Sequence, residues 1–126
     1  MRYTEFAIAA ALSQAAQEPA YRAAFISPTR KDSAAALAIA ATLGPGTLAI
    51  SNSTVTMANG GRVFFRPCTT TAARGLPALH EIYLDCCDRA IGFNETYAAL
   101  LPCLEPYGQN AKLIRIVAHA NECWKS

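Results

Sequence analysis

The spacing of apolar residues along the chain predicts alternating helices and short strands. Residues 4–17 place apolar side chains three and four positions apart, which indicates a helix. Thr4 is expected to cap its N-terminus, and Glu5 lies in the first turn, where the helix dipole favours an anion. The apolar run Arg22–Ser27 is short and stops at Pro28, so it predicts a buried strand.

The middle of the chain predicts a helix followed by a hairpin. Residues 33–43 are rich in alanine and predict a helix, with Asp32 or Ser33 as its cap and the Gly-Pro-Gly sequence at 44–46 as its end. Residues 47–56 are rich in β-branched side chains and predict a strand. The Ala-Asn-Gly-Gly turn at 58–61 joins it to a second strand at 62–67, so the two predict an antiparallel hairpin.

The last third predicts a strand, a helix and a strand. Residues 81–85 form an apolar run that ends on Asp85, and residues 112–117 form another. Asn94 is expected to cap a helix over residues 94–104 that Pro102 bends or breaks. The order of these elements is typical of a three-layer α/β fold, in which helices flank a mostly parallel sheet, here with an inserted antiparallel β-hairpin.

Length, composition and charge narrow the class of protein. With 126 residues, of which 52% are hydrophobic and 16% charged, the chain is not disordered, and residues 1–126 are expected to form a single domain. The net charge of +2 excludes a strongly basic tail for nucleic acid, though not a local basic patch. No membrane-spanning run and no leader peptide are recognisable, so a cytoplasmic location without membrane contact is expected.

The cysteines give no sign of a metal site. The five are Cys68, Cys86, Cys87, Cys103 and Cys123. None is paired at the spacing of metal ligands, and the two histidines are isolated, so no metal is expected. We interpret the cysteines as reduced, buried thiols, with a reactive thiol at Cys86 as the alternative.

Polar turns follow the predicted parallel strands at residues 27–30, 85–88 and 118–121. In an open parallel sheet ligands bind at the carboxyl ends of the strands, so these turns are the candidate site. An apolar strand that closes on Asp85 is similar to a Walker B segment, whose carboxylate holds Mg²⁺. A turn or capping role for this acid is the alternative.

The order and spacing of these pieces resemble the ATPase domain of the tailed-phage terminase large subunit, a P-loop NTPase that packages DNA into proheads. The matching pieces are the Ser-Pro-Thr-Arg turn at 27–30, the Asn-Gly hairpin at 55–62, Arg74-Gly75 before the strand that ends on Asp85, and the last helix and strand. The resemblance covers about residues 4–124. It implies a P-loop NTPase-like fold of phage or mobile-element origin, acting in a bacterial host cell.

Three departures from the family pattern imply a degenerate ATPase. No Gly-rich loop with Lys and Ser or Thr is present, and residues 4–9 are similar to the helix that follows such a loop. Cys86 stands where the resemblance places the catalytic Glu, and a cysteine cannot orient and activate water as a carboxylate does. Ala118-His119-Ala120 replaces the polar start of the coupling motif, and no nuclease domain follows. No catalytic or nucleotide-binding residue and no cofactor are therefore expected, with Mg-ATP bound only if another chain completes the site.

Basic residues near the predicted turns form a candidate phosphate or DNA patch. They are Arg30, Lys31, Arg62, Arg66 and Arg74. Because the net charge is only +2, an ordinary solvated surface is the favoured alternative.

The predicted function is a terminase-like ATPase-domain homologue that is inactive alone and acts as an interaction module. The resemblance places the strand before the phosphate loop beside the last strand, so that without it the last strand is an exposed edge. The residues of this association edge are Lys112, Leu113, Ile114, Arg115, Ile116 and Val117. A homodimer or a partner strand is expected there, and a C-terminal tail folded over the edge with Trp124 is the alternative. A fragment of a packaging ATPase completed by another chain, and an unrelated small α/β protein, remain open as functions.

Overall fold

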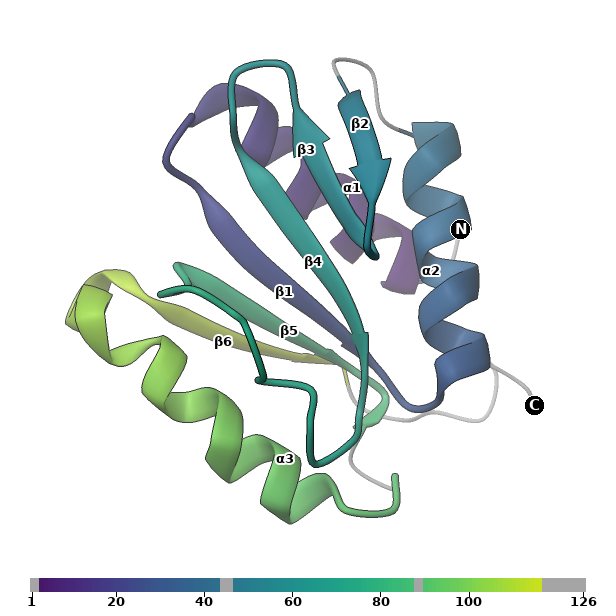
Figure 1. The fold of residues 1–126 in the computed structure, drawn as a ribbon, viewed down its shortest axis with the longest axis vertical. Coiled ribbons are helices and arrows are strands. Elements are labelled where there is room, and N and C mark those ends of the chain that lie inside the picture. Colours follow the sequence, from purple (N-terminus) through teal and green to yellow (C-terminus); the bar gives the residue numbers. More distant parts are fainter. Residues whose placement is uncertain (1–2, 44–46, 88–89, 117–126) are drawn as a thin grey trace.

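In the part of the chain that it describes, the computed structural model has six strands in one sheet with helices on both faces (Figure 1). It describes residues 3–43, 47–87 and 90–116. The helices in these ranges are α1 (Tyr3–Gln17), α2 (Arg30–Leu43) and α3 (Phe93–Leu100), and two 3₁₀ segments follow, η2 (Leu101–Cys103) and η3 (Glu105–Asn110). The strands are β1 (Arg22–Ser27), β2 (Thr47–Ser51), β3 (Thr54–Met57), β4 (Arg62–Pro67), β5 (Glu81–Asp85) and β6 (Lys112–Ile116).

The sheet has the strand order β2-β3-β4-β1-β5-β6. β4, β1, β5 and β6 are parallel to one another, whereas β3 is antiparallel to both β2 and β4. The predicted α/β class, with a mostly parallel sheet and an inserted antiparallel hairpin, is therefore confirmed. Because the four parallel strands end at the same edge, the turns after β1, β4 and β5 lie at that edge.

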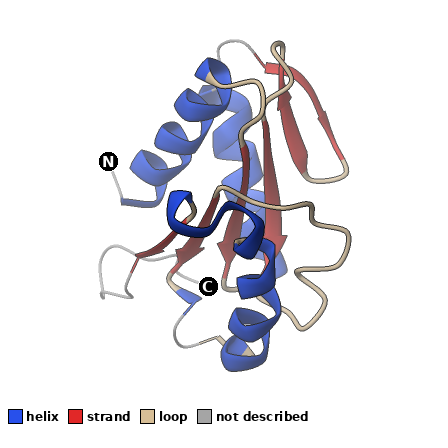
Figure 2. Ribbon diagram, turned by 90° about the vertical axis from the view of Figure 1, so that its left-hand side faces the viewer, coloured by secondary structure: helices blue, strands red, loops and turns tan. Residues whose placement is uncertain are grey.

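Alternating side chains on the central strands build two cores. Phe25 of β1 faces α1 and α2, where it packs with Phe65 and Tyr83, and Ile26 faces the other side, where it packs with Leu84. The second core is covered by α3, η2 and the loop between β4 and β5, a layer that Figure 2 shows apart from the two longer helices. Among the described residues, no helix has the length and apolar character needed to cross a membrane.

The hairpin is more elaborate than the sequence predicts. The predicted pairing of the strands around the Asn-Gly turn is confirmed as β3 and β4. The prediction of one strand over residues 47–56 is wrong, because Asn52 and Ser53 have φ values of 52° and 59° and turn the chain back between β2 and β3. Two successive residues with positive φ make the tight turn of a hairpin, and glycine usually supplies them. With no glycine at these positions, the sequence gives little sign of the turn.

The helix starts also differ from the prediction. α2 begins at Arg30, three residues before the predicted start, because Thr29 provides the cap in place of Asp32 or Ser33. The main-chain N–H of Asp32 donates to Thr29 Oγ1 at 3.1 Å, and this hydroxyl donates to Asp32 Oδ2 at 2.9 Å. Thr4 lies inside the first turn of α1 and its hydroxyl is bound elsewhere, so the prediction that it caps the helix is wrong.

The helix predicted over residues 94–104 is shorter. α3 is preceded by Gly92, whose φ of 78° forms the entry to the helix, so Asn94 is not the cap. The α-helix ends at Leu100 and Pro102 lies in η2, in agreement with the predicted break. Of the predicted last strand, Lys112–Ile116 is present as β6. Val117 and the predicted turn and tail at 118–126 fall outside the described residues.

The Asn-Gly-Gly turn of the hairpin docks directly on the end of α1. Asn59 Nδ2 donates to the carbonyl oxygen of Ala16 at 3.0 Å, and Gly60 has a φ of 101°. A Cβ atom at Gly61 would lie 2.3 Å from the carbonyl oxygen of Ala15. A side chain at this position is therefore excluded by backbone atoms of the helix.

Candidate functional site

The carboxyl end of β5 carries a buried carboxylate that contacts the first turn of α1. Thr4 Oγ1 donates to Asp85 and lies 2.9 Å from Oδ1 and 3.0 Å from Oδ2. Both residues are fully buried. Asp85 lies two residues after Tyr83 on β5, so both side chains are on the same face of the strand, the face that α1 covers. This alternation brings the carboxylate under the start of the helix.

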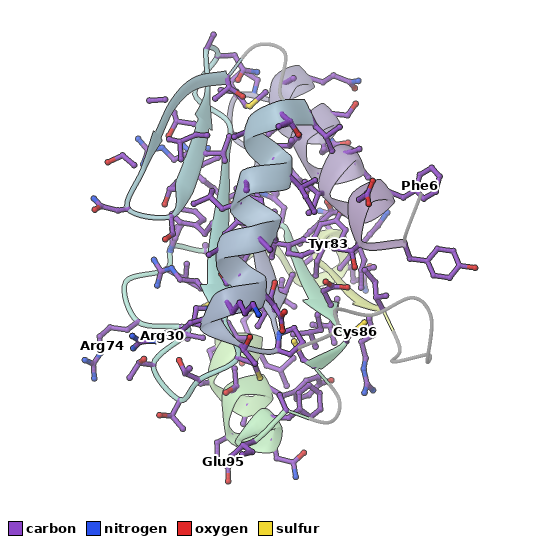
Figure 3. All side chains as sticks on the ribbon, turned by 90° about the vertical axis from the view of Figure 1, so that its right-hand side faces the viewer. Phe6, Arg30, Arg74, Tyr83, Cys86 and Glu95 are labelled. Atoms are coloured by element: carbon purple, nitrogen blue, oxygen red, sulfur yellow. The ribbon has the colours of Figure 1, made fainter. Side chains whose placement is uncertain are left out.

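Cys86, next to this carboxylate, has an unusual backbone. Its φ of 58° lies in the left-handed region, which few residues other than glycine adopt. Its main-chain N–H donates to the carbonyl oxygen of Ile116 at 2.8 Å, which aligns the turn with the end of β6. Figure 3 labels Tyr83, which lies on β5, and Cys86, which directly follows that strand. Such backbone strain is frequent at functional sites.

Ser27 brings a third oxygen to this end of the sheet. It ends β1, directly after Ile26, which is in register with Leu84 of β5. Ser27 therefore stands at the level of Asp85 on the neighbouring strand, and its position in the alternation puts it on the same face. Its Oγ atom is buried and forms no hydrogen bond within the described part of the chain. We call Thr4, Ser27 and Asp85 the strand-end cluster.

The strand-end cluster meets only part of the requirement for Mg-ATP. A hydroxyl and a strand-end carboxylate are the protein groups that hold Mg²⁺ in P-loop NTPases. Among the described residues no three His, Cys, Asp or Glu side chains come together as a metal site. The 126 residues also contain no Gly-rich loop with a lysine for the phosphates, and Cys86 supplies no carboxylate base. The residues present do not fit Mg-ATP hydrolysis, and no hydrolytic step is derived from them.

Cysteines near the strand ends differ in state. Cys68, Cys87 and Cys103 are free thiols, and the first two are buried. Burial, together with neighbouring Cys68 and Asp85, raises the pKa of the Cys87 thiol well above its usual range. Cys86 is disulfide-bonded, so the expectation of a reduced thiol is wrong at that position.

The five basic residues of the candidate patch separate into two groups. Arg30 and Arg66 line the same cavity at the carboxyl edge of the sheet. Arg66 Nη1 donates to the carbonyl oxygen of Arg74 at 2.9 Å, which places that loop residue nearby. Figure 3 shows Arg30 and Arg74 projecting to the same side of the view, and Lys31 is exposed beside Arg30. Arg62 begins β4, about 13 Å along the strand from Arg66 at ~3.3 Å per residue, and does not join them.

The cavity between Arg30 and Arg66 has a volume of about 420 Å³. The residues that line it come from α2, β4, the β2–β3 turn and the β4–β5 loop. They are Arg30, Ser33, Ala34, Leu37, Ser53, Arg66, Pro67, Thr69, Thr71 and Ala72. The sequence identifies the two arginines as candidate patch residues and residue 33 as a candidate helix cap. It gives no sign of the other lining residues, because only the order of the strands in the sheet brings them together.

A second polar cluster lies at the opposite end of the strands. The hydroxyl of Tyr21 donates to Glu81 Oε1, and the hydroxyl of Tyr83 lies 3.4 Å from the same oxygen. Burial, with a smaller contribution from the Glu81 charge, raises the pKa of Tyr83 to about 12. Burial and the bond to Glu81 raise the pKa of Tyr21 further. The ring centroids of His80 and Tyr107 are 3.8 Å apart, so the two rings stack. The His80 ring also accepts a hydrogen bond from the main-chain N–H of Arg22. This second cluster therefore lies at the amino ends of the parallel strands.

β6 is an edge strand within the described residues. The N–H of Lys112 donates to the carbonyl oxygen of His80, and the carbonyl oxygen of Ile116 accepts from Cys86, so both groups face β5. Because these groups alternate in a parallel ladder, the N–H groups of Leu113 and Arg115 face away from β5. Ile114 is partly buried against the α1 and α2 core. The outer edge of β6 therefore presents main-chain N–H groups. The apolar side chains of this strand are only partly buried.

Comparison with known proteins finds no match, either among protein-family models or among curated proteins.

Proposed function

We propose that this chain is a terminase-like homologue of a P-loop NTPase domain that does not hydrolyse ATP alone and acts as an interaction module. The observation that carries the proposal is the buried hydrogen bond between Thr4 and Asp85. It joins the first turn of a helix to the acid at the end of an apolar strand. In P-loop NTPases the equivalent groups are the hydroxyl at the start of the helix after the phosphate loop and the Walker B acid.

The sheet order supports the same descent. β5, which ends on Asp85, lies between β1 and β6 in a parallel arrangement. The resemblance expects a helix and then the coupling-motif strand after the Walker B strand, and α3 and β6 follow β5 in that order. The Asn-Gly hairpin of β3 and β4 follows α2 in the order that the resemblance requires.

The absence of hydrolysis follows from two features of the sequence. Cys86 occupies the position after the acid, where the resemblance expects the glutamate that activates water. No lysine-bearing Gly-rich loop is present in the 126 residues to hold the β- and γ-phosphates. With no held γ-phosphate, the Thr4–Asp85 pair keeps a structural role.

Interaction through β6 is the activity that remains. Unpaired main-chain groups at a sheet edge accept a further strand, from a second copy of the chain or from another protein. The basic ends of the edge, Lys112 and Arg115, are exposed. They limit nonspecific pairing without blocking an ordered partner.

Calorimetric titration with Mg-ATP tests the ATPase part of the proposal. At ATP concentrations up to about 1 mM we expect no release of phosphate and no saturable heat that Asp85→Asn abolishes, since affinities weaker than this correspond to less than about 4 kcal/mol. An active P-loop ATPase titrated in the same buffer is the positive control. Binding in the micromolar range, weakened by Asp85→Asn, would show that the strand-end cluster does hold nucleotide and would overturn the proposal.

A further inference from the structure

The cavity between Arg30 and Arg66 has the features of a binding site, and none of its lining residues belongs to the strand-end cluster. Its volume of about 420 Å³ falls in the range of small-molecule sites. Arg30 contributes from the start of α2 and Arg66 from the end of β4, so the two arginines line the cavity from different elements. Two arginines on the wall of one cavity favour an anion there, since a guanidinium group donates charge-assisted hydrogen bonds.

Neither arginine is neutralised by an acid in the described parts of the chain. Arg66 donates only to main-chain oxygens, those of Ala72 at 3.4 Å and Arg74 at 2.9 Å. The side chain of Arg30 forms no hydrogen bond or ion pair with the described residues. The nearest acid in sequence, Asp32, is buried, is bound to Thr29, and does not line the cavity.

The remaining lining is divided between hydroxyls and apolar groups. Ser33, Ser53, Thr69 and Thr71 bring four hydroxyl groups from three elements. Leu37, Pro67 and the two alanines supply apolar contact. Two of the main-chain amides at the start of α2 are already used, since those of Asp32 and Ser33 bond to Thr29.

Ser53 adds a geometric detail. Its φ of 59° would cost glycine nothing, whereas serine is strained there, and its carbonyl oxygen is fixed by the N–H of Phe65 at 2.8 Å. The strained turn therefore holds a hydroxyl group at the cavity wall.

We propose that this cavity binds a small phosphomonoester of the size of a nucleoside monophosphate. The two arginines and the hydroxyls would hold the phosphate, as guanidinium groups do through paired N–H donors. The apolar wall would contact the organic part. A pocket of this size, with hydroxyls on several sides, fits a discrete ligand better than the continuous backbone of a nucleic acid, which an open basic groove accommodates. The site does not depend on P-loop ancestry.

Titration of the intact chain with AMP, inorganic phosphate and a 12-nucleotide single-stranded DNA tests the proposal. We expect AMP to bind with a dissociation constant of about 1 mM or tighter and phosphate to compete with it. Arg30→Gln should weaken AMP binding about tenfold, the usual loss of a charge-assisted hydrogen bond. Arg62→Gln removes the same charge at the far end of β4 and should change AMP binding less than twofold, within the scatter of surface charge effects.

A second variant separates a loss of binding from a loss of folding. Ser53→Gly removes the hydroxyl and relaxes the turn, so it should weaken AMP binding without lowering thermal stability. Equal losses in Arg30→Gln and Arg62→Gln would reduce the effect to nonspecific electrostatics and overturn the proposal. DNA binding that AMP does not displace, or no saturable AMP binding at all, would also overturn it.

Discussion

Thr4 and Asp85 are 81 positions apart in the sequence, yet one hydroxyl bridges both oxygens of the carboxylate at 2.9 and 3.0 Å. The contact fixes the first turn of α1 over the end of β5, in a region from which water is excluded. A buried carboxylate needs such donors because the loss of solvation is otherwise uncompensated. The pair is therefore a structural link between the first helix and the sheet, whatever ligand this end of the sheet binds.

Thr4→Val tests that link. The variant keeps the shape of the side chain but removes one donor from a buried carboxylate, so the free energy of unfolding should fall by about 1–3 kcal/mol. Urea denaturation measures the change. Thr4→Ser retains the hydroxyl and should recover most of the loss.

A matched control is available in α3. Thr96 Oγ1 is also buried but has no hydrogen-bond partner among the described residues. Thr96→Val should therefore be neutral or stabilising, because it removes an uncompensated polar group. Equal destabilisation by Thr4→Val and Thr96→Val would show that the bond to Asp85 contributes nothing specific.

Gly61→Ala tests the contact between the hairpin turn and α1. The new Cβ would meet the Ala15 carbonyl oxygen at 2.3 Å, and this oxygen belongs to the backbone of α1, so it cannot move aside as a flexible side chain would. We expect the free energy of unfolding to fall by about 3 kcal/mol, at the upper end of the range for overpacking. Gly75→Ala is the control for backbone conformation alone: its φ is 78° with open space around the Cβ, and the cost should be about 1 kcal/mol. A smaller loss at Gly61 than at Gly75 would contradict the close approach.

The elements that the sequence predicts well are those with strong local signals. Proline follows the end of β1, an acid ends β5, and glycine forms the turn at Asn59 and Gly60. The predicted positions of these three features are confirmed. The β2–β3 turn has no glycine at its two residues with positive φ, Asn52 and Ser53, so the sequence pattern does not predict it. Local chemistry decides both outcomes.

The site is less predictable because it depends on contacts between distant segments. The sequence identifies Asp85 as a strand-end acid, but Thr4 fits a helix cap equally well until the fold places it against β5. The candidate basic residues divide only when strand direction is known, since Arg62 and Arg66 are four residues apart and lie near opposite ends of β4. The second polar cluster, which contains Tyr21, Glu81 and Tyr83, corresponds to no recognisable sequence motif.

Stability at high pH should reflect the buried tyrosines. The pKa of Tyr83 is raised from 10.0 to about 12, because burial disfavours the phenolate in the folded state. The unfolded chain therefore loses this proton first as pH rises. The stabilisation is fully present below pH 10 and is lost as the pH rises to about 12. Denaturation midpoints between pH 9 and 12, with tyrosinate absorbance, would measure this, and Tyr83→Phe should make the decline less steep.

The β6 edge can be blocked without disturbing the β5–β6 ladder. Arg115→Pro removes an N–H that faces away from β5, and proline is tolerated on the outer side of an edge strand. Arg115 is exposed, whereas Ile114 packs partly against the core and is less suitable for substitution. Arg115→Ala is the matched control: it also loses the contact of the guanidinium with the Phe93 ring, 5.5 Å away, but it keeps the N–H.

The most direct test of the interaction module is the mass of the chain in solution by light scattering at high micromolar concentration. We expect a dimer for the native chain and for Arg115→Ala, and a monomer of about the native chain mass of 13.4 kDa for Arg115→Pro, with its thermal unfolding still cooperative. A native chain that remains a 13.4 kDa monomer, or a dimer that Arg115→Pro leaves intact, would contradict association through β6.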